Sequence, residues 1–262
     1  MTGPHITHLS FTRLKELAHS PLALKQYIEG GKTTTAAMTA GTLLDCLLFT
    51  PEEIERKFVI IPKVSRATKE GKALWADAEQ RARGENGEPD KEIITDEQLA
   101  EAQFLDTCIR QNSTVAFHGL LNPDFFKFQV PVKFNYGGFE HKGIKDADGN
   151  RRDGQRVIWD LKRMGARSGE LLVSSQIRNN LYDLQAAIYC HPFDQKGEDV
   201  KYYVIAVDND GFVTPFEITR DSRNKARILW NKLLKAANRC NFEGLDMGCE
   251  FWAEQDGFFY FY

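Results

Sequence analysis

The stretch that decides the fold runs from Val157 to Lys162 and reads VIWDLK. Its apolar residues predict a buried β-strand, and strand side chains alternate between the two faces of a sheet. One face is predicted to carry Val157, Trp159 and Leu161. Asp160 and Lys162 lie two residues apart and therefore share the other face with Ile158. A carboxylate and an ammonium there indicate either a half-exposed strand with an ion pair or half of a metal-dependent phosphodiesterase site.

Length and composition narrow the classes of protein to consider. The chain has 262 residues, of which 42% are hydrophobic and 27% charged, as in a globular protein of one large or two small domains. No apolar run is long enough to span a bilayer, and the N-terminus lacks a charged-then-apolar signal, so we expect a cytoplasmic protein. The net charge of −3 opposes non-specific coating of nucleic acid but allows a local basic channel.

The five cysteines are scattered and include no CxxC pair. This spacing opposes a zinc ribbon, a disulfide framework and an iron–sulfur cluster, and it favours buried free thiols.

The order of elements predicts a mixed α/β protein. We expect helices over 10–29 (broken at Ser20-Pro21), 35–48, 73–83 and 96–111. From residue 125 the apolar residues recur at every second position, with Phe126, Phe128, Val130 and Val132 on one face. This pattern and those that follow predict strands over 125–136, 139–148, 157–162, 201–207 and 212–218. Helices are predicted over 176–189 and 221–239. The single expected domain comprises a mainly helical part (1–120), a catalytic sheet and helix (121–220), and a C-terminal helix with an aromatic tail (221–262).

The chemistry of phosphodiester cleavage favours the metal-site interpretation. Mg²⁺ neutralises phosphate charge and activates water when hard oxygen ligands from separate elements hold it. A nearby lysine can orient or deprotonate the water. Asp160 and Lys162 meet half of this requirement, and Asp146 on the neighbouring predicted strand can meet the rest.

Several segments carry a family resemblance. Gly143-Ile144-Lys145-Asp146 followed by Asp160-Leu161-Lys162 resembles the GxxD…DxK core of the PD-(D/E)xK nucleases, and Gln185 to Tyr189 (QAAIY) is similar to the QxxxY motif of their RecB-like branches. Upstream, LKELAHSPLALKQYIEG, MTAGTLLDCLLFTPEE and SRATKEGKALW resemble, in order, the segments of RecE-type phage and prophage exonucleases. The ordered set covers most of residues 8–190.

The resemblance implies a restriction-endonuclease-like fold, a mixed central sheet flanked by helices with a helical N-terminal part. It implies a Mg²⁺-dependent DNA exonuclease, with Mn²⁺ as a substitute, that degrades one strand of linear duplex 5′ to 3′ without ATP. The implied partners are duplex DNA ends, further copies of the chain in a trimeric or tetrameric ring, and a single-strand annealing protein, in phage-type recombination inside a bacterial cell.

The resemblance also assigns roles to individual residues. The expected catalytic residues are Asp146, Asp160, Lys162, Gln185 and Tyr189, and the expected metal ligands are Asp45, Asp146, Asp160 and Leu161. Asp45 departs from the family, which usually has histidine there, and Gln129 stands near a position that is acidic in many relatives. Gln185 and Tyr189 could equally pack beneath the sheet.

Basic residues near these segments are candidate phosphate contacts. The expected DNA-binding residues are Arg66, Lys69, Lys72, Arg151, Arg152 and Arg163, and their structural alternative is solvated loops.

Three alternatives to an exonuclease stay open. Asp45 in place of histidine motivates a DNA-binding or assembly module with weak catalysis. The same residues would also suit a related endonuclease, or an enzyme that cleaves RNA.

Overall fold

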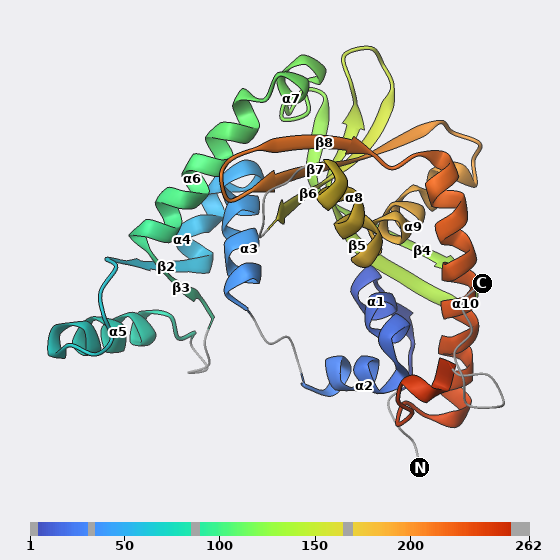
Figure 1. Cartoon of the computed structure of the whole chain (residues 1–262), viewed down its shortest axis with the longest axis horizontal. Coiled ribbons are helices and arrows are strands. Elements are labelled where there is room, and N and C mark those ends of the chain that lie inside the picture. The colour runs from blue at the N-terminus through green and yellow to red at the C-terminus, as the bar shows by residue number, and fades with distance from the viewer. Residues whose placement is uncertain (1–4, 31–34, 85–89, 165–169, 253–262) are drawn as a thin grey trace.

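The structure, a computed structural model, describes residues 5–30, 35–84, 90–164 and 170–252 (Figure 1). Its helices are α1 (Phe11–His19), α2 (Pro21–Gly30), α3 (Ala36–Phe49), α4 (Ile54–Lys57), α5 (Lys69–Arg81), α6 (Asp96–Gln111), α7 (Ser113–His118), α8 (Glu170–Asn179), α9 (Tyr182–Asp194) and α10 (Arg220–Glu243), with 3-10 turns at Pro51–Glu53 and Cys249–Trp252. Its strands are β1 (His8–Leu9), β2 (Phe58–Ile61), β3 (Glu92–Thr95), β4 (Phe126–Tyr136), β5 (Phe139–Asn150), β6 (Arg156–Met164), β7 (Val200–Asp208) and β8 (Val213–Glu217).

The central sheet is mixed and has the order β1-β5-β6-β7-β8, with β4 paired to β5 off this path. The β4–β5, β5–β6 and β7–β8 pairs are antiparallel, whereas β1–β5 and β6–β7 are parallel. β2 and β3 form a separate parallel pair. The expected mixed sheet with flanking helices is therefore confirmed.

Two helical layers cover the sheet. One apolar cluster unites α1, α2, α9 and α10 with one face of β6 and β7, and includes Ile158, Tyr202 and Trp230. The other unites α3, α6 and α7 with the opposite face, and includes Trp159 and Leu161. The predicted alternation of VIWDLK is thus confirmed, and Asp160 and Lys162 belong to the face on which Ile158 packs against the α9 layer.

Several helices begin at a polar residue whose side chain caps them. Ser10 accepts a hydrogen bond from Arg13 N at the start of α1, and Thr95 forms a capping box with Gln98 at the start of α6. The predicted break at Ser20-Pro21 separates α1 from α2. Thr68 caps α5, so this helix begins at Lys69, four residues before the expected position.

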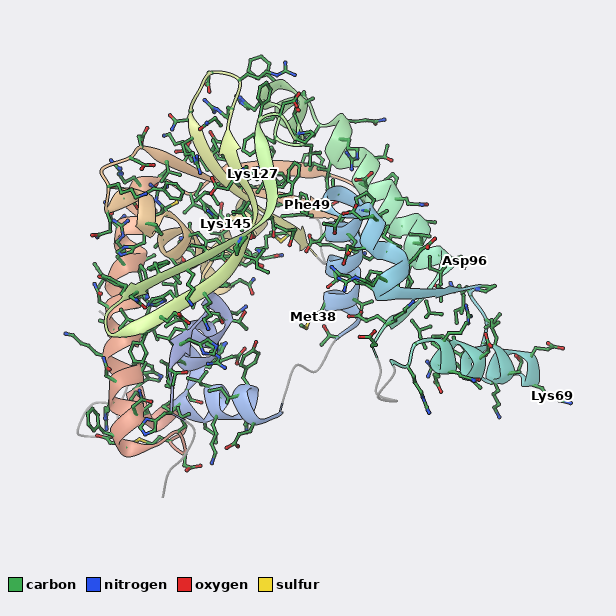
Figure 2. All side chains as sticks on the ribbon, turned by 180° about the vertical axis from the view of Figure 1, so that it is seen from behind. Met38, Phe49, Lys69, Asp96, Lys127 and Lys145 are labelled. Carbon is green, nitrogen blue, oxygen red and sulfur yellow. The ribbon has the colours of Figure 1, made fainter. Side chains whose placement is uncertain are left out.

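The helix α5 packs on β2 and projects from the rest of the molecule. Figure 2, viewed from behind, shows Lys69 on this outlying helix, while Lys127 and Lys145 mark the β4–β5 hairpin on the opposite side of α3.

Two local predictions are wrong. The expected continuous helix over 176–189 is two helices, because Leu181 between them adopts a left-handed conformation with φ 57° and ψ 36°. The expected single apolar face of β4 changes sides: Phe126 packs in the α3 layer, whereas Val132 packs in the α9 layer. The change coincides with Gln129, whose φ is 51°, because a left-handed residue interrupts the alternation of a strand.

Within the described ranges, no helix is both long enough and apolar enough to cross a membrane. The cysteines Cys46, Cys190 and Cys240 are buried free thiols, as expected.

Candidate active site

The acidic residues meet where two strands of the sheet diverge. The β5–β6 ladder ends at the pair Ala147–Trp159, after which β5 continues against β4 and β6 continues against β7. Asp146 and Asp160 are the next residues beyond this last pair. Asp146 Oδ2 accepts a hydrogen bond of 2.7 Å from Leu161 N and so replaces the missing backbone partner. The strand divergence therefore brings both carboxylates to one point and leaves the side of β5 toward β6 open there.

Asp160 lies at the centre of the polar contacts. Its side chain is buried, forms an ion pair with Lys162 and accepts a 3.1 Å hydrogen bond at Oδ1 from Gln185 Nε2 on α9. The Lys162 ammonium also lies 5.0 Å from the ring centre of Tyr182. The structure thus joins the predicted DxK strand to the predicted QxxxY helix.

The glycine of the GxxD segment is explained by Tyr189. The ring of Tyr189 covers Gly143 so closely that a Cβ there would lie 2.7 Å from Tyr189 Cε1 and from its hydroxyl oxygen. Tyr189 lies one helical turn after Gln185 on α9, and burial raises the pKa of its hydroxyl to about 12. Gln185 and Tyr189 are therefore both buried, and Gln185 contacts Asp160; their catalytic role stays a prediction.

Asp45 on α3 adds a third carboxylate. Burial first, and then the charge of Asp160, raise the pKa of Asp45 to about 7 against the opposing effect of Lys162. Burial, and then the charges of Asp160 and Asp45, likewise raise the pKa of Asp146 well above its usual value. Because each carboxylate disfavours the charge of the others, the site carries more negative charge than its surroundings balance.

Lys162 supplies one balancing cation. Burial opposes its charge, but the carboxylates of Asp160 and Asp146 outweigh that effect and raise its pKa. The lysine is therefore an ammonium at neutral pH, able to donate hydrogen bonds to an anion or a water molecule.

The donor atoms at the strand divergence suit a divalent cation. No group of three or more His, Cys, Asp or Glu side chains in the described ranges is arranged as a metal site. The donors that do adjoin are two carboxylates, Asp146 and Asp160, with the backbone of Leu161 between them. These are hard oxygen ligands of the kind Mg²⁺ prefers, and their unbalanced charge would be relieved by a cation. The predicted pair of Asp146 and Asp160 therefore fits a divalent cation, while Leu161 and Asp45 stay predicted ligands.

A cavity of 320 Å³ lies beside Asp45. Its lining includes Thr42, Cys46, Lys57 and Gln129. Gln129 stands opposite Asp146 in the β4–β5 register, between the pairs Phe128–Ala147 and Val130–Lys145. The positive φ of Gln129 thus occurs next to the acidic residues, where strained backbone is typical of functional sites.

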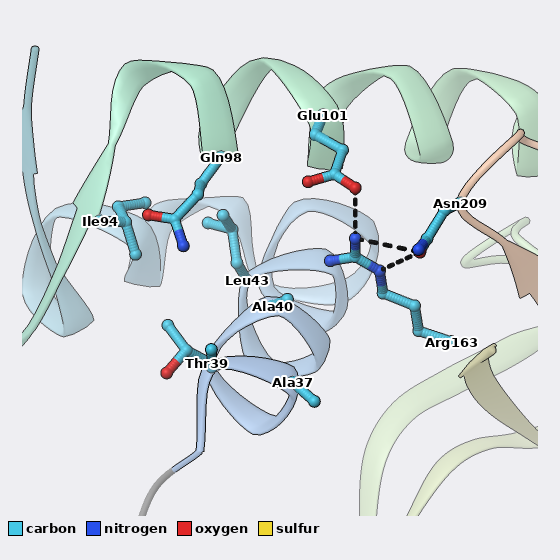
Figure 3. Close-up of a pocket in the computed structure, with 10 residues that line it drawn as sticks. Ala37, Thr39, Ala40, Leu43, Ile94, Gln98, Glu101, Arg163 and Asn209 are labelled. Carbon is cyan, nitrogen blue, oxygen red and sulfur yellow. Dashed lines mark hydrogen bonds and ion pairs between the residues drawn. The ribbon is translucent and has the colours of Figure 1, made fainter. Parts of the chain in front are cut away.

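The predicted DNA-binding residues of the core are placed separately. Arg151 and Arg152 belong to the β5–β6 turn, where Arg151 forms an ion pair with Asp153 and donates to Tyr203 Oη at 2.7 Å, while Arg152 is exposed. Arg163 faces the α3 layer. Figure 3 shows it reaching Glu101 and Asn209 at the edge of a second cavity of 320 Å³.

The predicted DNA-binding residues Arg66, Lys69 and Lys72 lie on the outlying α5 and the loop before it. All three are exposed, and the Arg66 guanidinium lies 3.6 Å from the ring centre of Trp75. The structure does not bring them to the acidic residues (Figure 1).

Sequence reasoning missed Tyr182, because no spacing rule links it to Lys162 across the break at Leu181. It also missed a buried ion cluster in which Asp148 pairs with Lys145 and, at 2.6 Å, with Arg156. The GIKD motif drew attention to Lys145, but residues three apart lie on opposite faces of a regular strand, so the spacing gave no signal for its pairing with Asp148.

Comparisons with known proteins support the fold. No family model matches the chain, and no curated protein matches it. A solved structure from Eubacterium rectale described as a "Putative exonuclease" has a TM-score of 0.60 and 13% identity over 90% of this chain and 82% of that one. Two further structures are too dissimilar to carry an argument. SSO0001 has a TM-score of 0.30 and 16% identity over 56% of this chain and 59% of that one. VC1899 from Vibrio cholerae has a TM-score of 0.23 and 17% identity over 90% of this chain and 57% of that one. The chain therefore shares the fold of the Eubacterium rectale protein.

Proposed function

We propose that this protein is a metal-dependent deoxyribonuclease that degrades linear double-stranded DNA from its ends. The observation that carries the proposal is the meeting of Asp146 and Asp160 at the β5–β6 divergence, with Lys162 paired to Asp160. The fold shared with a structure described as an exonuclease supports it.

The metal ligands in this proposal are Asp146, Asp160 and Leu161, the last through its backbone oxygen, with Asp45 supporting them electrostatically. A bound Mg²⁺, or Mn²⁺ in its place, would neutralise phosphate charge and lower the pKa of a bound water. The raised pKa values of Asp45 and Asp146 agree with a carboxylate set built to face a cation.

The chain's own residues perform the remaining tasks. Lys162 orients the attacking water and stabilises the charge that develops on the phosphate. Gln185 fixes the orientation of Asp160 through its 3.1 Å hydrogen bond. Tyr189, one helical turn after Gln185, packs on Gly143 and so fixes the separation of α9 from β5.

The finer features rest on the family resemblance of the sequence. We include in the proposal 5′-to-3′ polarity, independence from ATP, assembly into a ring of three or four copies, and cooperation with a single-strand annealing protein in phage-type recombination.

The test is a nuclease assay with Mg²⁺ on end-labelled linear duplex and on covalently closed circles. The wild-type protein should digest the linear DNA and spare the circles, and Lys162→Ala should lose at least about a hundredfold in rate. Lys142→Ala, which removes an exposed lysine paired with Glu140 on β5, is the matched control and should be unaffected. Equal cutting of both DNA forms would indicate an endonuclease, and full activity of Lys162→Ala would refute the proposed site.

A second candidate is a DNA-binding or assembly module with weak catalysis. Its motivation is Asp45, whose charge adds to that of Asp146 and Asp160 where the resembling family has histidine. Asp45→His separates the two: a large gain in activity supports the weak module, whereas a loss supports Asp45 as a working residue.

A further inference from the structure

The break between α8 and α9 places two polar residues beside the candidate active site. Leu181 has φ 57° and ψ 36°, and among the described non-glycine residues only Gln129 shares such a positive φ. A leucine has no intrinsic preference for this conformation, so the surrounding structure must impose it. The residues on either side, Asn180 and Tyr182, are partly exposed.

Asn180 holds a lysine of α1 in a fixed position. Lys15 Nζ donates a 2.9 Å hydrogen bond to Asn180 Oδ1, while Asn180 Nδ2 donates at 3.1 Å to the backbone oxygen of Gln176. The second bond fixes the amide with its oxygen toward Lys15. α1 packs against α9, so Lys15 extends from one helix to the start of the other.

Lys15 is held near the catalytic lysine. Tyr182, two residues after Asn180, lies under the Lys162 ammonium, with 5.0 Å between Nζ and the ring centre. Burial lowers the pKa of Lys15; the charge of Glu16 opposes this effect, and the positive charge of Lys162, the smallest of the three, adds to it. The two ammonium groups are therefore close enough to repel each other, although Glu16 has the larger effect on Lys15.

The charges of the two lysines are balanced differently. Lys162 is paired with Asp160, whereas Lys15 forms no ion pair with any residue that the structure describes. Its one hydrogen-bond acceptor is the neutral amide of Asn180. Lys15 therefore presents a positioned and partly exposed ammonium, without an ion pair to any described residue, near Lys162.

We propose that Lys15, held by Asn180 next to Lys162 and Tyr182, binds a backbone phosphate of the DNA strand that neighbours the phosphate being cut. The inference rests on the proposed nuclease function and adds a substrate contact to it. A phosphodiester supplies the single negative charge that Lys15 lacks and accepts charge-assisted hydrogen bonds from an ammonium. Such a contact positions the strand without reading its sequence.

The test uses Lys15→Gln, which keeps a donor for Asn180 but removes the charge. Affinity for a short linear duplex is measured by fluorescence anisotropy at several salt concentrations, and kcat and KM are measured with Mg²⁺. Lys15→Gln should weaken binding by about five- to tenfold, lower the salt-dependence slope by about one, and raise KM more than it lowers kcat. Asn180→Asp should act in the same direction, because it retains the acceptor and neutralises Lys15.

Lys25→Gln is the matched control, because this lysine of α2 already pairs with Asp246, and it should bind DNA like the wild type. If the wild type neither binds nor cuts DNA, the proposed function fails, and this inference fails with it. If the wild type cuts DNA but both Lys15→Gln and Asn180→Asp keep its affinity, salt slope and KM, this inference alone is refuted.

Discussion

Gly143→Ala tests the packing that joins the two motifs of the site. The added Cβ would lie 2.7 Å from Tyr189 Cε1 and from the Tyr189 hydroxyl oxygen, and 3.1 Å from Cζ. Carbon atoms pack at about 3.5–4.0 Å, so the ring must move by about 1 Å. Tyr189 is only 5% exposed, and every residue of α9 from Leu184 to His191 is buried, so the helix has little room to move.

The size of the effect follows from two opposing terms. Overpacking in a core costs about 1–3 kcal/mol. Gly143 does not have a positive φ, so alanine fits its backbone and recovers about 0.4–1 kcal/mol by restricting the unfolded chain. The net loss of about 1–2 kcal/mol should lower the melting temperature by roughly 2–8 °C for a chain of this length. Because Tyr189 and Gln185 share the helix α9 and Gln185 holds Asp160, movement of this helix should lower kcat by about tenfold or more.

Thermal unfolding and the exonuclease assay measure these effects. Gly41→Ala is the control, because a Cβ on that helical glycine meets nothing within 4 Å and should stabilise α3 by up to about 1 kcal/mol. A double-mutant cycle with Tyr189→Ala isolates the clash, since removing the ring should abolish the cost of Gly143→Ala. An unchanged melting temperature for Gly143→Ala, or the same cost in the Tyr189→Ala background, would refute the reasoning.

Four other outcomes are expected. Burial lowers the pKa of His141 to about 4, so below pH 6.5 the unfolded chain takes up a proton that the folded chain does not. The free energy of unfolding should therefore fall by about 2 kcal/mol toward pH 4.5. Acid titration of His141→Phe should show a shallower fall. Gln185→Ala should lower kcat by about tenfold with a small change in KM, and Gln185→Glu should lower it further by adding a carboxylate beside Asp160; steady-state kinetics decide both. Mg²⁺ at a hundred times its dissociation constant should stabilise the protein by about 2.7 kcal/mol in thermal unfolding, an effect that EDTA reverses and Asp160→Asn lacks. Trp159→Phe removes the 3.1 Å hydrogen bond from Trp159 Nε1 to the Leu120 oxygen and should cost about 1–3 kcal/mol in urea unfolding, and an unchanged midpoint would contradict it.

The sequence by itself determined the elements with strong local signals. Alternation in VIWDLK assigned Trp159 and Asp160 to opposite faces, proline after Ser20 ended the first helix, and Thr95 marked the start of α6. Each signal depends on residues within one turn or one strand. It can therefore be recognised without knowing which helices or strands pack against that segment.

The tertiary structure decided the features that depend on distant partners. The left-handed conformations of Gln129 and Leu181 have no local signal, because neither is a glycine, and the folded structure around them must impose them. The approach of Asp45 to Asp160, and of Lys15 to Lys162, likewise joins residues more than a hundred positions apart in the sequence. Spacing along a chain predicts which side chains share a face, but only the folded chain determines which faces meet and which charges must then be balanced.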